Sequence, residues 1–213
     1  MIDSRQKNTL IIFLKYPQAG KVKTRLARDV GAQRAAEFYS QMSKTIIENV
    51  LDTNSYRTII FYDPPERENE IRSWLGSKQC PITPQTGESL GDKITDAFTQ
   101  VFSSGADKAV IIGTDCIDVT SKTITQAINS LNNTDIVLGP AEDGGYYLLG
   151  LKRHIPEIFQ EIDWSTNRVL AQTLEKIKEK KLKYELLETL KDIDTLEDLN
   201  GSIEIFVKAA EAK

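Results

Sequence analysis

The chain has 213 residues, with 27 Lys and Arg against 31 Asp and Glu, and its formal net charge is −4. With 40% hydrophobic and 27% charged residues it can bury a core, while the acidic balance argues against a protein that coats nucleic acid. Its apolar runs are far shorter than the roughly 20 residues of a membrane helix, so we expect no membrane span and a cytoplasmic protein.

Cysteine and histidine are scarce in this sequence. The two cysteines, Cys80 and Cys116, show neither CxxC spacing nor a paired framework, which argues against a disulfide scaffold and a zinc ribbon. The single histidine, His154, excludes any site that needs two imidazoles. We expect His154 at the surface and Cys116 as a small buried residue.

Strand and helix patterns alternate along the chain. In order, the hydrophobic periodicity predicts a strand at 9–15, a helix at 32–51, a strand at 57–62, a helix at 66–75, a loop or edge strand at 78–87, a helix from 90 to near 104, a strand at 108–113, a helix at 123–131, strands at 135–139 and 146–151, a helix at 167–180, a strand near 184–187 and a helix opened by Thr195. This alternation predicts an α/β sandwich with a mixed, mostly parallel sheet. The short turn before 146–151 makes that strand antiparallel or repositions it within the sheet.

Helix-capping residues are also predicted. Ser165 or Thr166 is available as the N-cap of the helix at 167–180, and Asp198 stands in capping-box spacing to Thr195. Asp118 is expected to cap the helix that follows it.

The segments that follow three of the strands carry the candidate chemistry. In open α/β sheets, ligands bind beyond the carboxyl ends of the strands. The loop after the first strand is basic, and no acidic residue lies among its five cations: Lys15, Lys21, Lys23, Arg25 and Arg28. Lysine and arginine neutralise a pyrophosphate, and backbone N–H groups near Gly20 can approach it closely. The alternative is a solvent-exposed turn, although cations at the start of a helix oppose its dipole.

Carboxylates follow the next two strands of interest. Asp115 comes directly after the apolar strand at 108–113, where a divalent cation is its natural partner, since Mg²⁺ needs only one or two protein carboxylates when phosphates supply the rest. Asp143 lies in the turn Glu142-Asp143-Gly144-Gly145, which can bring a second carboxylate beside Asp115. A plain hairpin turn is the alternative for this segment.

An ordered set of motifs resembles a known family. These are FxKxPxxGKVKTRL at 13–26, GESLG at 87–91, IGTDC at 112–116, GPAEDGGYYLLGL at 139–151, DWST at 163–166 and DIDTxEDL at 192–199. The set is similar to the bacterial transferases with the GT-A, nucleotide-diphospho-sugar transferase fold that are associated with radical-SAM enzymes and selenium domains. The resemblance covers nearly the whole chain and implies a single GT-A-like domain over residues 1–213, with a nucleotide-binding half at 9–118 and an acceptor half with C-terminal helices at 119–213.

The resemblance also implies site residues. It places the nucleotide at Lys15, Gly20, Lys21, Lys23, Thr24, Arg25, Gly91 and Lys93, the acceptor at Gly144, Gly145, Tyr146, Asp163 and Trp164, and Mg²⁺ or Mn²⁺ at Asp115 and Asp143. Two positions depart from the family pattern, because Ile117 stands where proline is common and Lys93 where arginine is common. Lysine does not reproduce the bidentate grip of a guanidinium.

Three functions stay open on the sequence. The first is metal-dependent transfer of a sugar from a nucleotide-diphospho-sugar to a small acceptor, with Asp143 either completing the metal site or acting as general base. The second is nucleotidyl transfer that releases pyrophosphate from an NTP. The third is a non-catalytic module that binds a nucleotide or a partner. No nucleic-acid partner is expected, and the sequence gives no oligomeric state.

Overall fold

The computed structural model describes residues 7–51, 54–76 and 80–199. Its centre is a seven-stranded sheet in the order β3-β2-β1-β4-β6-β5-β7. The strands are β1 (Asn8–Lys15), β2 (Arg57–Asp63), β3 (Ile82–Pro84), β4 (Lys108–Ile112), β5 (Ile136–Pro140), β6 (Tyr146–Leu151) and β7 (Tyr184–Leu186). β6 runs antiparallel to both of its neighbours, and every other pairing is parallel. The mixed, mostly parallel sheet predicted from the sequence is confirmed.

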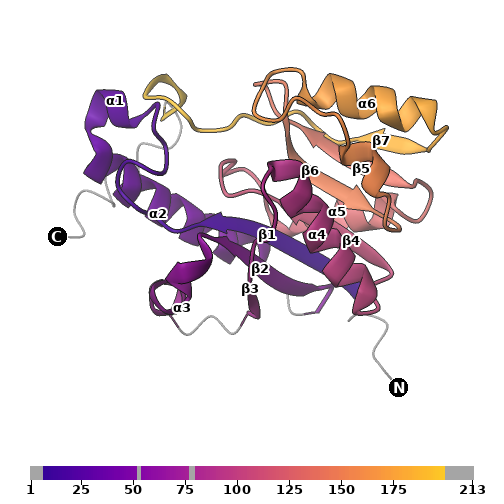
Figure 1. Ribbon diagram of the computed structural model, residues 1–213, viewed down its shortest axis with the longest axis horizontal. Coiled ribbons are helices and arrows are strands. Elements are labelled where there is room, and N and C mark those ends of the chain that lie inside the picture. The colour runs from indigo at the N-terminus through magenta and orange to yellow at the C-terminus, as the bar shows by residue number, and fades with distance from the viewer. Residues whose placement is uncertain (1–6, 52–53, 77–79, 200–213) are drawn as a thin grey trace.

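Helices cover both faces of this sheet (Figure 1). They are α1 (Ala27–Val30), α2 (Ala32–Val50), α3 (Glu68–Leu75), α4 (Leu90–Ser103), α5 (Ser121–Ser130) and α6 (Val169–Glu179), with 3-10 turns at Pro65–Arg67, Pro156–Phe159 and Glu197–Leu199. No helix in the described part of the chain is long and apolar enough to cross a membrane.

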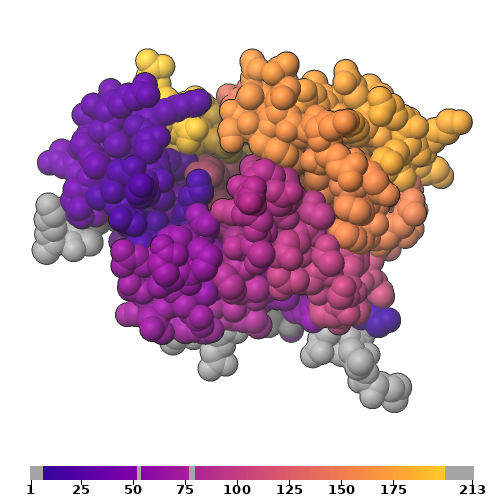
Figure 2. Space-filling view, viewed as in Figure 1, coloured from indigo at the N-terminus to yellow at the C-terminus, as the bar shows by residue number. Residues whose placement is uncertain are grey.

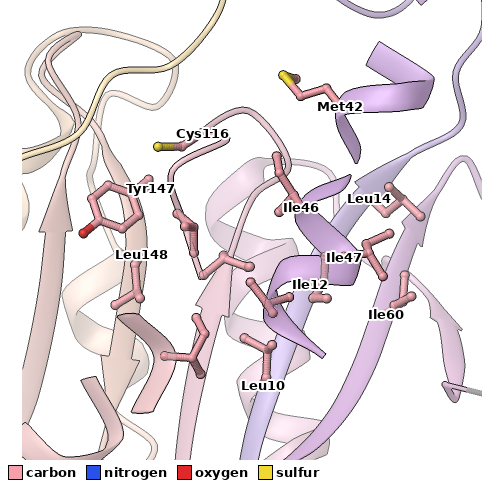
Figure 3. Packing of buried hydrophobic residues seen from close by; sticks show 14 of the residues in the cluster. Leu10, Ile12, Leu14, Met42, Ile46, Ile47, Ile60, Cys116, Tyr147 and Leu148 are labelled. Atoms are coloured by element: carbon pink, nitrogen blue, oxygen red, sulfur yellow. The ribbon is translucent and has the colours of Figure 1, made fainter. Parts of the chain in front are cut away.

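Two apolar clusters hold the three layers together, one on each face of the sheet. Because side chains alternate along a strand, Leu10, Ile12 and Leu14 of β1 point to one face and Ile11 to the other. The first cluster packs β1 against α2, α3 and α5. Figure 3 shows the apolar side chains of α2 packed over those of β1. The second cluster packs Ile11 against α4, the 156–159 turn and α6.

Several local predictions need correction. α6 begins at Val169 rather than at residue 167, and neither Ser165 nor Thr166 is its N-cap, because residues 164–168 form a run of turns and Thr166 Oγ1 donates to Asp163 O at 2.7 Å. Asp118 does not cap the next helix, since Thr120 occupies that position in a capping box with Thr123.

Three further elements differ from their predicted form. The helix expected at 66–75 is divided into a 3-10 turn and α3. The edge strand is the short β3, while residues 78–79 of its predicted segment lie outside the described residues. Asp198 does accept from Thr195 N and Oγ1, at 2.8 and 2.7 Å, but only a 3-10 turn follows within the described chain, and residues from 200 onward lie outside it.

Candidate functional site

A cleft of about 950 Å³ opens where the ends of β1 and β4 meet the β5–β6 turn. β1 pairs with β2 on one side and with β4 on the other, so the strand order reverses at this point of the sheet. Open α/β sheets bind ligands at such points. Figure 2 shows the surface hollowed where the indigo, magenta and orange parts of the chain meet. The cleft is lined by four cations, Lys15, Lys21, Lys23 and Arg25, and by four carboxylates, Asp115, Asp143, Asp192 and Asp194.

A buried tyrosine ties the basic loop to the acidic side. The hydroxyl of Tyr39, on α2, accepts from the Lys15 backbone N–H at 3.0 Å and shares a hydrogen bond with Thr114 Oγ1 at 2.9 Å. Burial first, and then the charge of Asp115, raise the pKa of Tyr39, so the phenol stays protonated. The ends of β1 and β4 are therefore held side by side, with Asp115 next to the linkage.

The segment after β7 supplies two of the four carboxylates. It crosses the molecule from β7 toward α1 (Figure 1), and its Ile193 N–H donates to Asp115 O at 3.0 Å. Ile193 is buried in the core cluster on the α2 face. Its neighbours Asp192 and Asp194 are thereby fixed at the cleft beside Asp115.

Lys23 is the buried cation of the cleft. Its ammonium forms ion pairs with Asp115 Oδ1 and, at 3.0 Å, with Asp194 Oδ1, and its side chain is only 2% exposed. Burial alone lowers the pKa of Lys23, but the charges and hydrogen bonds of the two aspartates outweigh it, so the net pKa is raised and the lysine stays charged. Arg25 adds a looser contact to Asp194, at 3.6 Å.

Asp192 has an unsatisfied carboxylate. Its Oδ1 is buried without a hydrogen-bond partner among the described residues. Burial, followed by the charges of Asp115 and Asp143, raises the pKa of Asp192 to about 7. Cys116, which is buried nearby, has a pKa raised to about 12 by burial and by Asp192, so its thiol is protonated and unreactive.

The β5–β6 turn carries the fourth carboxylate. Asp143 Oδ1 accepts from the Gly145 N–H at 2.8 Å, which fixes the side chain over its own turn. Gly144, at φ +88°, accepts from the Leu170 N–H of α6 at 2.9 Å, and a Cβ on Gly144 would stand 2.2 Å from Asn167 O. The turn therefore packs directly against the residues that lead into α6.

An indole links the two halves of the cleft. A Cβ on Gly91, in the first turn of α4, would lie 2.5 Å from Trp164 Nε1, so only glycine leaves room for this indole. Trp164 also meets the ring of Tyr146 edge-on, with 6.5 Å between ring centroids. The first turn of α4 and the segment before α6 are thus in contact through Trp164.

Most of the predicted site residues line this one cleft. Those that do are Lys15, Lys21, Lys23, Thr24, Arg25, Asp115, Asp143, Gly145, Tyr146 and Trp164. Gly91 and Gly144 lie directly behind its walls, as described above. Gly20, Lys93 and Asp163 lie outside the lining residues, and the Lys93 ammonium pairs with Asp63 at 2.9 Å. Asp163 pairs with Arg168 at 3.0 Å.

Sequence reasoning missed three cleft residues of clear chemical interest. Asp192 and Asp194 carry no role of their own in the motif at 192–199, although two acids that flank one apolar residue can both lie on the same side of the chain. Gln85 follows the edge strand and is buried in the cleft wall, where its Nε2 donates to Phe61 O at 2.9 Å and leaves Oε1 as an acceptor. A lone glutamine in a loop gives no such signal in the sequence.

The donor set offers a divalent cation few protein ligands. In the described parts of the chain, no three His, Cys, Asp or Glu side chains form a cluster that could hold a metal ion by themselves. Mg²⁺ and Mn²⁺ need few protein carboxylates when phosphates complete the shell. The half-exposed Asp115 and the partnerless Oδ1 of Asp192 fit that smaller role.

The sequence profile of a bacterial family, DUF2064, described as "Uncharacterized protein conserved in bacteria", matches residues 46–166. The chain belongs to the DUF2064 family. The crystal structure of a "putative nucleotide-diphospho-sugar transferase" from Desulfovibrio desulfuricans G20 is 33% identical to this DUF2064 protein, with a TM-score of 0.87, covering 92% of this chain and 85% of that one. The GT-A-like, nucleotide-diphospho-sugar transferase fold is thereby confirmed. The association with radical-SAM enzymes remains a prediction.

More distant structures share the fold of the DUF2064 protein. CMP:2-keto-3-deoxy-manno-octonic acid synthetase complexed with CTP is 11% identical, with a TM-score of 0.55 over 98% of this chain and 100% of that chain. Rv0371c of Mycobacterium tuberculosis H37Rv, in complex with manganese, is 12% identical, with a TM-score of 0.53 over 93% and 99%. No curated protein matches the chain significantly in sequence.

Proposed function

We propose that this DUF2064 protein is a metal-dependent transferase that takes a sugar from a nucleotide-diphospho-sugar and passes it to a small-molecule acceptor. The observation that carries the proposal is the cleft itself, where four cations from one loop face four carboxylates from three segments. Such a cleft can hold a diphosphate and a cation together. The relative from Desulfovibrio, named a "putative nucleotide-diphospho-sugar transferase", supports the choice of donor.

The basic loop is the proposed diphosphate site. Lys15, Lys21 and Arg25 are exposed at the cleft and can reach phosphate oxygens, and only the arginine offers a planar fork for a bidentate contact. Gln85 is proposed to contact the base, because its fixed amide offers Oε1 to an N–H donor. Lys93 stays a proposed nucleotide contact only if it leaves Asp63.

Asp115 and Asp192 are the proposed holders of Mg²⁺ or Mn²⁺, with Asp143 as the remaining candidate. When bound there, the ion supplies positive charge that stabilises a departing diphosphate. Asp192, with its pKa near 7, loses its proton readily when a cation arrives beside it. This assignment gives a ligand to the buried Oδ1, which has no hydrogen-bond partner within the described part of the chain.

Asp143 is the proposed general base. Its Oδ1 is engaged with Gly145, which leaves Oδ2 to accept a proton. The acceptor hydroxyl gives its proton to Asp143 and its oxygen forms a bond to the anomeric carbon of the donor. The bond from that carbon to the diphosphate breaks, and the nucleoside diphosphate leaves with the electron pair. Trp164 and Tyr146 form the aromatic wall on which the acceptor is proposed to pack.

Nucleotidyl transfer is the second candidate. It is favoured by the shared fold with a synthetase complexed with CTP. In that reaction the acceptor oxygen attacks the α-phosphorus of an NTP and pyrophosphate leaves, while the same basic loop and carboxylates serve the phosphates. The leaving group distinguishes the two reactions, because only nucleotidyl transfer releases pyrophosphate.

A thermal-shift panel of NTPs and nucleotide sugars, with and without Mn²⁺, tests nucleotide binding first. We expect stabilisation by at least one nucleotide, and more of it with Mn²⁺. The stabilising nucleotide is then incubated with a set of small acceptors, and the release of nucleoside diphosphate or pyrophosphate is measured. A protein that no nucleotide stabilises contradicts the whole proposal, and binding without either product under the acceptor panel favours a non-catalytic module.

A further inference from the structure

Lys23 differs from the other cations of the cleft in its surroundings. Lys15, Lys21 and Arg25 are exposed, whereas the Lys23 side chain is 2% exposed and its ammonium lies between Asp115 and Asp194. Its backbone adopts φ +45°, a conformation that side-chain-bearing residues rarely take. The fold therefore holds this lysine inward at a cost in backbone energy, and its charge is compensated by these two carboxylates.

The oxygen that Lys23 contacts belongs to the main proposed metal ligand. A divalent cation and an ammonium that contact the same carboxylate of Asp115 repel each other strongly. Water weakens this repulsion little, because the side chain of Lys23 is buried. Metal binding therefore requires Lys23 to withdraw from Asp115. A buried ammonium that loses a carboxylate partner needs another anion, and the phosphate oxygens of a nucleotide are of the right charge.

We propose that Lys23 is an internal stand-in for the metal ion, which occupies Asp115 in the nucleotide-free protein and moves to the phosphates when nucleotide and metal bind together. The inference rests on the proposed function and adds to it a coupling between metal binding and nucleotide binding. The metal alone binds weakly, since it must displace the Lys23 ammonium while no phosphate is present to pair with it. Phosphate and metal then raise each other's affinity, as linkage requires.

The surroundings of Lys23 permit this exchange without unfolding the site. Arg25 Nη1 already lies 3.6 Å from Asp194 Oδ2, so this carboxylate keeps a cation when Lys23 leaves. Asp115 and Asp194 have side chains that are 52% and 39% exposed, so water solvates them as the ion pair opens. Ile193, anchored to Asp115 O and buried in the core, holds the carboxylate positions while the lysine moves.

Binding of Mn²⁺ alone, measured by electron paramagnetic resonance of the free ion in the absence of nucleotide, tests the inference. We expect the Lys23→Met variant to bind Mn²⁺ about tenfold or more tightly than the wild type, because the competing charge is gone. Lys21→Met is the matched control, since it removes an exposed cation from the same loop and cleft. Lys23→Arg keeps the competing charge and is expected to bind Mn²⁺ as weakly as the wild type.

Two features keep the test decisive. Thermal melting establishes that each variant is folded, and Lys23→Gln, a second neutral variant whose amide can still hydrogen-bond to both aspartates, replaces Lys23→Met if that one does not fold. Equal Mn²⁺ affinity in the neutral variants and the wild type overturns the inference, as does an equal gain in Lys21→Met. The nucleotide panel separates this failure from a failure of the proposed function, because Mn²⁺-enhanced nucleotide stabilisation of the wild type does not depend on the Lys23 variants.

Discussion

The two walls of the cleft are built in opposite ways. The basic wall comes from one continuous stretch of chain, from Lys15 at the end of β1 to Arg25, only ten positions later. The acidic wall comes from three segments, the end of β4 with Asp115, the β5–β6 turn with Asp143, and the strand-like segment after β7 with Asp192 and Asp194. One wall is therefore a property of local sequence, and the other exists only once the sheet is assembled.

This difference has an energetic side. Three of the four cations are exposed, so water solvates them and they repel one another little. The acidic wall holds a buried carboxylate with a raised pKa and relies on Lys23 for compensation. We therefore expect substitutions in the acidic wall to change both chemistry and stability, while substitutions of exposed basic residues change binding alone.

The largest effect is expected from Asp115→Ala. It removes the proposed metal ligand and should lower the rate of product formation by about 10²-fold or more, because charge stabilisation of the leaving group is lost. It should also abolish the extra thermal stabilisation that Mn²⁺ gives to nucleotide binding. Asp118→Ala, three residues later, exposed and away from the cleft lining, is the control and should behave as the wild type. Unchanged Mn²⁺ dependence in Asp115→Ala contradicts the metal assignment.

Two glycines in the segments that build the opposing walls form a matched pair for stability. Gly20 has φ +77° with nothing within 4 Å of an added Cβ, whereas Gly144 has φ +88° and an added Cβ would stand 2.2 Å from Asn167 O. Gly20→Ala should lower the free energy of unfolding by about 1 kcal/mol through backbone strain. Gly144→Ala should lower it by a further 1–3 kcal/mol, roughly, through steric overlap. Urea unfolding measures both, and equal losses would show that the turn relaxes away from α6.

A smaller loss of stability is expected from Asp198→Ala. The Asp198 carboxylate accepts from Thr195 N, Thr195 Oγ1 and Asp194 N, at 2.8, 2.7 and 3.1 Å, and pairs with Lys191 at 2.9 Å. Losing these contacts should cost about 1–2 kcal/mol, in the range of a lost helix cap. Glu197→Ala, an exposed neighbour in the same turn, is the control. A loss no greater than that of the control indicates that Asp198 does not anchor the acidic segment.

The smallest effect concerns pH and Asp192. Its folded-state pKa of about 7 exceeds the ordinary 3.8, so between those values the folded protein keeps a proton that the unfolded chain has released. The group's contribution to stability therefore falls as pH rises through this window, and the penalty is complete above pH 7. With EDTA present, Asp192→Asn should raise the melting temperature by about 2–4 °C at pH 8 and change it little at pH 4. A gain of equal size at both pH values contradicts the raised pKa.

Much of the fold could be predicted because its strands carry clear patterns. The runs at β1 and β4 are continuous and apolar, as expected of strands buried on both faces, and both were located within one residue of their observed ends. Helix starts were harder. The α6 start was misplaced because Ser165 and Thr166 are good capping residues, whereas Thr166 Oγ1 here donates to Asp163 O and accepts from the Arg168 N–H, within the turns that precede the helix.

The site was predictable to the extent that it is local. Lys15, Lys21 and Arg25 stand together in the sequence, and their lack of acidic neighbours marks them. Nothing local indicates that Lys23, from the same run, turns inward to pair with Asp194, 171 residues later in the chain. The buried position of Gln85 is equally invisible, because it depends on a contact with β2.

The sequence alone determined the alternating architecture, the edge of the sheet at which the candidate site residues gather, and the concentration of positive charge after β1, since these follow from periodicity and composition over short stretches. The tertiary structure decided which carboxylates share the cleft, and that one lysine of the basic loop compensates them. The physical reason is the range of the interactions. Hydrophobic periodicity acts over a few residues, whereas the balance between a buried ammonium, its two aspartate partners and the buried Asp192 depends on distances that only the assembled sheet fixes.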